Sequence, residues 1–136
     1  MANMACGNSG LNLGHAMVLP LSAQFGIPHG IAAGAILPYV LEFNLPVAGK
    51  RLLPLIMAMG FEPDAGLEYL LKELVSLLED LNFPKDLEGL GVKQSALSEM
   101  AGQVVKFPMA KSNLRKANAN EVLNIYKAAF SGRKKE

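Results

Sequence analysis

The sequence predicts an all-α protein, and three observations favour this class. Apolar residues recur at steps of three and four in several stretches, no stretch alternates with period two, and glycine or proline separates the stretches. About half of the 136 residues are hydrophobic (51%), which suits one domain with a well-buried core. We therefore expect a single helical domain over residues 1–136, built as a bundle of about six helices.

The first two helices are expected to flank a glycine-proline turn. One helix runs from about Gly10 to Phe25, with Asn8 or Ser9 as its N-cap, and it ends at Gly26. The second opens at Pro28, a residue that suits a first helical turn, and continues to about residue 43.

The later helices are marked by turn residues and by apolar stripes. Asn44-Leu45-Pro46 predicts a turn, followed by a third helix over about 47–59. The fourth helix begins near Pro63-Asp64 and carries a leucine stripe on one face: Leu67, Leu70, Leu71, Leu74, Leu77, Leu78 and Leu81. A fifth helix is expected over 93–106 and an irregular stretch over 108–119. Asn118 and Glu121 have the spacing of a capping box that starts the last helix.

The charge balance narrows the function classes. The formal net charge of +1 gives no reason to expect a nucleic acid or an anionic membrane as partner. No charged side chain precedes Glu42, but polar residues and prolines interrupt this region, and its longest clean run, Ile31–Leu41, is too short to span a membrane. We expect a protein–protein or domain–domain interface there. Cys6 is alone, which excludes an intramolecular disulfide and favours a reducing, cytoplasmic location.

The only two histidines, His15 and His29, lie in this uncharged region. Two imidazoles in such surroundings are either core histidines or half of a metal site, since divalent first-row ions accept imidazole ligands. About 14 Å of helix separates His15 from the first helix end at 1.5 Å per residue. The rings therefore converge only if the chain doubles back before Pro28 or if Pro20 kinks the helix. No glycine-rich phosphate loop, catalytic triad or cysteine pair accompanies them.

Four segments in one register resemble the iron-containing (group III) alcohol dehydrogenase family. They are Asn8-Ser9-Gly10-Leu11-Asn12-Leu13-Gly14-His15-Ala16-Met17, Leu19-Pro20-Leu21, Gly26-Ile27-Pro28-His29-Gly30 and Ala35-Ile36-Leu37-Pro38-Tyr39-Val40-Leu41-Glu42-Phe43-Asn44. Phe83-Pro84-Lys85-Asp86-Leu87 and Asn113-Leu114-Arg115 fit more loosely. The resemblance is to the C-terminal helical domain of that family and covers essentially the whole chain.

The resemblance implies a metal-dependent oxidoreductase. Family members bind NAD(P) in an N-terminal α/β domain and Fe²⁺, or sometimes Zn²⁺, in the cleft beside the helical domain. The ligands are an Asp and a His from one helix and two later histidines, and His15 and His29 fall on those two later positions. The ion polarises the alcohol or carbonyl oxygen while hydride moves to or from nicotinamide.

Two departures from the family pattern limit this implication. The nucleotide-binding domain and the helix that supplies the other two ligands are missing from this chain, so it is expected to be partial, without catalytic or cofactor-binding residues of its own and inactive alone. In addition, Leu19 replaces a histidine that many members carry four residues after the His15 position.

Two partners are expected to cover the apolar surface of such a partial domain. One is the missing N-terminal half or a separate subunit that carries it, and the other is a second copy of this chain in a homo-oligomer. The alternative reading, from a different class of protein, is a non-catalytic helical interaction module whose histidines are relics.

Overall fold

The computed structural model describes residue 4 and residues 11–62 and 66–133, and within these residues the fold contains helices and no strand. The elements are α2 (Leu13–Phe25), α3 (His29–Ala58), α4 (Leu67–Asp80), a 3-10 turn η2 (Gln94–Ala96), α5 (Leu97–Val104), α6 (Pro108–Lys111) and α7 (Ala119–Ser131). The all-α prediction is confirmed, with six α-helices between residues 11 and 133.

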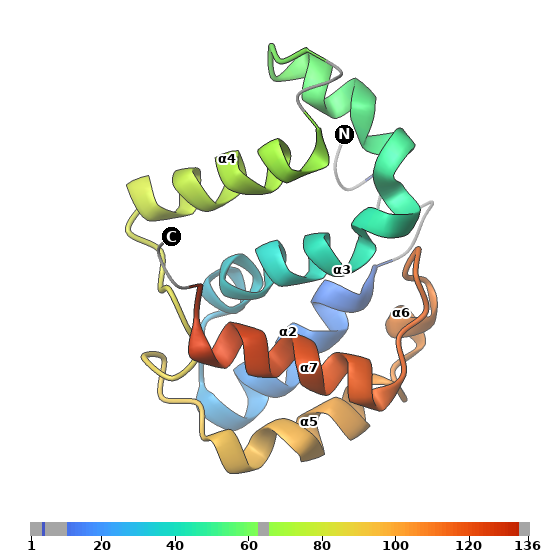
Figure 1. The fold of residues 1–136 in the computed structure, drawn as a ribbon. Coiled ribbons are helices and arrows are strands. Elements are labelled where there is room, and N and C mark those ends of the chain that lie inside the picture. Colours follow the sequence, from blue (N-terminus) through green and yellow to red (C-terminus); the bar gives the residue numbers. More distant parts are fainter. Residues whose placement is uncertain (1–3, 5–10, 63–65, 134–136) are drawn as a thin grey trace.

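Helix α2 lies at the centre of the bundle and packs against α3, α5 and α6, while α7 packs against α3 and α5 (Figure 1). Its fully buried side chains are Leu13, Ala16, Met17, Val18 and Leu21. Because apolar residues occupy most of its circumference, α2 is a core helix rather than a surface helix with one apolar stripe.

The predicted start of this helix is wrong by three residues. Asn12 is the N-cap: its backbone is extended (φ −111°, ψ −174°), and its side-chain oxygen accepts a hydrogen bond from the backbone N–H of Gly14 at 3.0 Å. A capped, extended residue cannot continue a helix, so α2 begins at Leu13. Asn8 and Ser9, the expected caps, lie outside the described residues. The predicted end is correct, with Gly26 in the left-handed region (φ 66°).

The predicted turn at Asn44-Leu45-Pro46 is also wrong, because α3 runs through it as one helix of 30 residues. Three prolines, Pro38, Pro46 and Pro54, lie inside α3, and the helix changes direction along its length (Figure 1). A proline lacks the N–H that would bond the carbonyl four residues earlier, and it bends the helix there. Distant side chains support this bend.

A polar network from the chain before α7 holds the bend of α3. The guanidinium of Arg115 donates to the Phe43 carbonyl at 3.1 Å and lies 4.0 Å from the centre of the Phe43 ring. The amides of Asn44 and Asn113 exchange hydrogen bonds, one of them 2.7 Å long. Arg115 also pairs with Glu121 at 2.9 Å. These contacts give the looser motif around Asn113 a structural role.

The ends of α5 and α7 follow from local sequence. The fifth helix is shorter than predicted, 97–104 after the 3-10 turn, because Phe107 is extended (φ −71°, ψ 134°) ahead of Pro108. The stretch expected to be irregular contains the short helix α6. The capping box between Asn118 and Glu121 is confirmed.

We call residues 47–58 of α3 together with α4 the distal arm. It rises away from α2, α5 and α7, and α4 returns above the first half of α3 (Figure 1). The expected start of its helix at 63–64 lies outside the described residues, and α4 begins at Leu67. The Phe83 ring then packs on Gly34 so closely that a Cβ at Gly34 would collide with it.

Among the described residues, α3 is the helix long and apolar enough to cross a membrane by length and composition, with a mean hydropathy of 1.5 in its best window. It reaches this length because the two helices expected on either side of Pro46 are joined. Of its best window 39% is buried, and the buried side chains, among them Ala32, Ile36 and Val40, belong to the bundle core.

Candidate metal centre

The structure brings the two predicted site residues together. The imidazole rings of His15 and His29 lie with their centroids 5.6 Å apart and their planes tilted by 40°. His15 is in the first turn of α2, and His29 is the first residue of α3.

The short link between α2 and α3 explains this convergence. From His15 to Phe25, α2 rises about 15 Å. Gly26 then reverses the chain with a left-handed backbone, and Pro28 is extended (φ −54°, ψ 136°). The link contains only three residues, so His29 follows soon after this reversal. The link therefore carries His29 back along α2, which is the first of the two routes that the sequence left open.

The ring separation suits a shared ion. Imidazole nitrogens bind Zn²⁺ at about 2.0–2.1 Å, which places each ring centroid about 3.2 Å from the ion. Two such rings at a tetrahedral angle have centroids about 5.2 Å apart, close to the observed 5.6 Å. Ordinary aromatic contacts span about 4.5–7 Å, so the same distance also fits two rings that merely pack.

The ligand set is incomplete within the part of the chain that the structure describes. No group of three or more His, Cys, Asp or Glu side chains is placed there to hold a metal ion. A catalytic zinc site uses three protein ligands and a structural one uses four. Any ion at His15 and His29 therefore needs further donors from beyond the described residues.

The outer face beside the histidines is apolar and uncharged. Leu19 lies one helical turn after His15 on the same face of α2 and is 37% exposed. Ser22 continues this face, and its buried hydroxyl has no hydrogen-bond partner among the described residues. No Asp, Glu, Lys or Arg occurs between residues 11 and 41.

The inner side of α2 is held by a hydrogen bond that the sequence did not predict. The buried hydroxyl of Tyr126 on α7 donates to the backbone carbonyl of Met17 at 2.6 Å. Burial raises the pKa of this tyrosine well above its usual value, so the hydroxyl stays protonated and keeps donating. Nothing in the sequence identifies the carbonyl that Tyr126 reaches, because Met17 lies 109 residues away.

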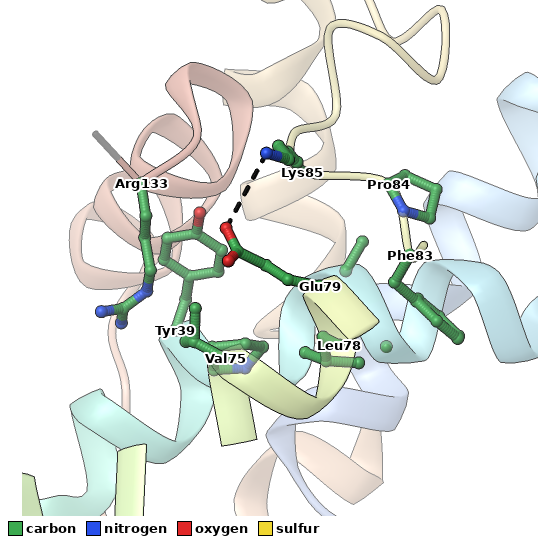
Figure 2. A pocket seen from close by; sticks show the side chains of 11 residues that line it. Tyr39, Val75, Leu78, Glu79, Phe83, Pro84, Lys85 and Arg133 are labelled. Atoms are coloured by element: carbon green, nitrogen blue, oxygen red, sulfur yellow. Dashed lines mark ion pairs between the residues drawn. The ribbon is translucent and has the colours of Figure 1, made fainter. Parts of the chain in front are cut away.

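A separate crevice lies between α3 and α4, and neither histidine lines it (Figure 2). Phe83, Val75 and Leu78 form apolar walls, and the Glu79–Lys85 ion pair of 3.8 Å lies at its edge beside Tyr39. Its volume is about 50 Å³. Ligand pockets usually measure about 300–1,000 Å³, so this crevice is too small for a dinucleotide.

Residues 1–130 match the C-terminal part of the family described as Fe-containing alcohol dehydrogenases. The chain belongs to this family. The predicted resemblance is confirmed, and so is the fold it implied.

Several relatives agree with this assignment. The chain is 32% identical over 135 residues to a 1,3-propanediol dehydrogenase of Citrobacter freundii, covering 96% of this chain and 35% of the relative. It is 33% identical over 139 residues to long-chain-alcohol dehydrogenase 1 of Geobacillus thermodenitrificans, covering 97% and 35%. An alcohol dehydrogenase structure from Oenococcus oeni superposes with a TM-score of 0.88 at 31% identity, covering 95% and 35%. The chain thus spans about a third of the length of these relatives.

Proposed function

We propose that this chain supplies two imidazole ligands, His15 and His29, to an Fe²⁺ or Zn²⁺ site of an NAD(P)-dependent alcohol dehydrogenase. The observation that carries the proposal is the 5.6 Å approach of the two rings. The sequence segments around them resemble the ligand segments of the family. When bound, such an ion supplies Lewis-acid polarisation of the alcohol or carbonyl oxygen.

The residues of this chain bind and orient the ion. Each neutral imidazole offers a nitrogen lone pair, and the Asn12 cap and the Gly26 turn fix the helix ends from which the rings project. The bond from Tyr126 to Met17 holds α2 against the bundle. Leu19 is an apolar neighbour one helical turn after His15, and it offers no group that transfers a proton.

The nucleotide site and the other metal ligands are supplied from outside residues 1–136. We propose that residues 1–136 form one helical domain that acts with an N-terminal region or subunit, which carries the nucleotide site and the other ligands. This chain covers only 35% of the length of its relatives, which supports this division. The domain alone is proposed to be inactive in hydride transfer, and the cytoplasm is its proposed location.

The second candidate function is a non-catalytic helical interaction module. The observation that favours it is the incomplete ligand set within the described residues. In that case the histidines only pack against each other, and loss of either one leaves metal uptake unchanged.

Metal titration of the purified chain separates these candidates. We expect anaerobic Fe²⁺ or Zn²⁺ binding that weakens at least tenfold in His15→Ala and in His29→Ala, with Lys93→Ala, at an exposed position, as the control. Metal uptake equal in all four proteins would contradict the ligand role. Oxidation of a primary alcohol with NAD⁺ or NADP⁺ by the chain alone would contradict the proposed inactivity.

A further inference from the structure

We propose that the crevice between α3 and α4 binds a small uncharged alcohol, a molecule with a chain of three or four carbon atoms and one hydroxyl group. The carbon chain lies between the apolar walls of the crevice, and the Tyr39 hydroxyl donates a hydrogen bond to the oxygen of the alcohol. Neither histidine lines this crevice, so the inference is independent of the proposed metal ligands.

The walls of the crevice suit a short carbon chain. Val75 and Leu78 of α4 and the ring of Phe83 line it (Figure 2), and Pro38 of α3 lines it as well. Its volume is about 50 Å³. This is roughly three to five times the space that one water molecule needs, which suits a molecule of a few carbon atoms. Water beside apolar walls finds few hydrogen-bond partners, so a carbon chain should displace it favourably.

One buried polar group at the crevice is available to a ligand. Tyr39 lines the crevice and is only 8% exposed, and no residue that the structure describes forms a hydrogen bond with its hydroxyl. Burial raises the pKa of this hydroxyl above its usual value, so the group is protonated at neutral pH and can donate. A ligand oxygen that accepts from Tyr39 therefore satisfies a donor that the described part of the fold leaves unpaired.

The charges at the crevice favour an uncharged ligand. Lys85 pairs with Glu79 at 3.8 Å, and Arg133 pairs with Glu42 at 2.7 Å. Figure 2 shows Glu79 and Lys85 at the same edge as the Tyr39 hydroxyl. A carboxylate placed there meets the like charge of Glu79, and an ammonium group meets that of Lys85. A ligand hydroxyl avoids both costs, because it can accept from Tyr39 and donate to a carboxylate.

The crevice joins the distal arm to the bundle, because α4 belongs to the arm and Tyr39 to the bundle core. A ligand in contact with both walls binds only the arrangement in which α4 is packed on α3. It therefore stabilises that arrangement by mass action. At saturation we expect slower hydrogen exchange of the α4 amides.

The experiment is an NMR titration of the isotope-labelled full chain with 1-propanol, in which the backbone amide shifts are followed. We expect saturable shifts confined to residues 34–39, 75–79 and 83–85. The dissociation constant should be on the order of 1–10 mM, since a ligand of so few atoms gains little binding energy. Shifts that increase linearly with concentration, or that spread evenly over the chain, would overturn the site.

A pair of variants on α4 locates the ligand. Val75→Phe fills the crevice with a ring, and we expect it to weaken binding at least tenfold. Ser76→Phe places the same ring at an exposed position of α4 and should leave binding unchanged. Circular dichroism checks that both variants remain helical. Equal affinity in Val75→Phe and in the unaltered chain would overturn the site.

A pair of tyrosine variants tests the hydrogen bond. Tyr39→Phe removes only the hydroxyl and should weaken binding at least threefold. Tyr69→Phe is the control, because its ring packs against Phe61 and does not line the crevice. An affinity that is the same in both variants would overturn the contact with Tyr39.

Ligands of equal length test the charge argument. Propionate and the propylammonium ion carry opposite charges on the same carbon chain as 1-propanol, and we expect each to bind at least fivefold more weakly. Tighter binding of either ion would overturn the choice of an uncharged ligand. These outcomes do not depend on metal uptake, so the titrations of His15→Ala and His29→Ala decide the proposed function separately.

Discussion

The bundle around α2 and the distal arm are held together in different ways. In the bundle, the large side chains Met17, Leu21, Ile36 and Tyr126 are completely buried. In the distal arm, large apolar side chains remain exposed: Val47, Leu55, Met57 and Leu77. One region excludes water from most of its apolar surface, whereas the other leaves much of it in contact with solvent.

This difference concerns the candidate metal centre directly. Both histidines belong to elements packed in the bundle, whereas the arm meets the bundle where α4 packs on α3 and where Phe83, just after α4, contacts Gly34. We therefore expect substitutions in the bundle to disturb the whole fold and substitutions in the arm to act locally. The following predictions test that expectation.

The largest effect is expected from the same truncation made in both regions. Leu21→Ala removes a completely buried side chain from α2 and should lower the free energy of unfolding by roughly 2–5 kcal/mol, since it leaves a cavity. Leu77→Ala, at a side chain 54% exposed, should change it by about 0.5 kcal/mol or less. Urea unfolding followed by circular dichroism measures both, and equal losses would remove the distinction between the regions.

A glycine pair tests the anchor of the arm. Gly34→Ala places a Cβ against the Phe83 ring and should cost roughly 1–3 kcal/mol as the ring is displaced. A Cβ at Gly102 in α5 meets no atom within 4 Å, so Gly102→Ala should stabilise by up to about 1 kcal/mol through helix propensity. Thermal unfolding compares them. Faster hydrogen exchange in α4 of Gly34→Ala alone would locate the effect in the arm.

The guanidinium at the bend of α3 provides the third test. Arg115→Ala removes the bond to the Phe43 carbonyl and the ion pair with Glu121. We expect the free energy of unfolding to fall by about 1–2 kcal/mol, a modest value because solvent weakens interactions of a partly exposed side chain. Arg115→Lys keeps the charge without the planar fork and should recover less than half of that loss. Full recovery in the lysine variant would show that charge alone supports the bend.

These contacts also show what the sequence can predict. The capping box at Asn118 and the turn at Gly26 depend on residues within a few positions of one another, and both were predicted correctly. Just before Pro46, α3 is contacted by partners 69 and 72 residues away, Asn113 for Asn44 and Arg115 for Phe43. A prediction from neighbouring residues alone therefore places a turn where the folded chain continues as a helix.

The candidate site shows the same division. The histidines and their surroundings could be singled out from the sequence, because the residue types and the family resemblance are visible there. Their approach to 5.6 Å depends on the backbone path through Gly26 and Pro28. The sequence left two routes open at that point, since helix periodicity does not specify the direction of a short link.

Tyr126 gives the bundle a dependence on pH. Burial raises the pKa of its hydroxyl in the folded state above the unfolded value of about 10. The folded chain thus binds this proton more tightly, so the stabilisation is present below pH 10 and is lost as the pH rises above it. Tyr126→Phe should cost about 1 kcal/mol at pH 7 and reduce the decline between pH 9 and about 11. Urea midpoints across this range measure both effects, and an unchanged decline would assign it to other groups.

The smallest effect is expected on the face of α2 that carries His15. The hydroxyl of Ser22 is buried without a hydrogen-bond partner among the described residues, which costs the folded state the hydration of that group. Ser22→Ala should therefore stabilise by about 0.5–1 kcal/mol. Ser76→Ala, at an exposed position of α4, gains only helix propensity, up to about 0.5 kcal/mol. If Ser22→Ala gains no more than Ser76→Ala, the Ser22 hydroxyl has a partner in solution, and this face of the bundle is better satisfied than the contacts of α2 indicate.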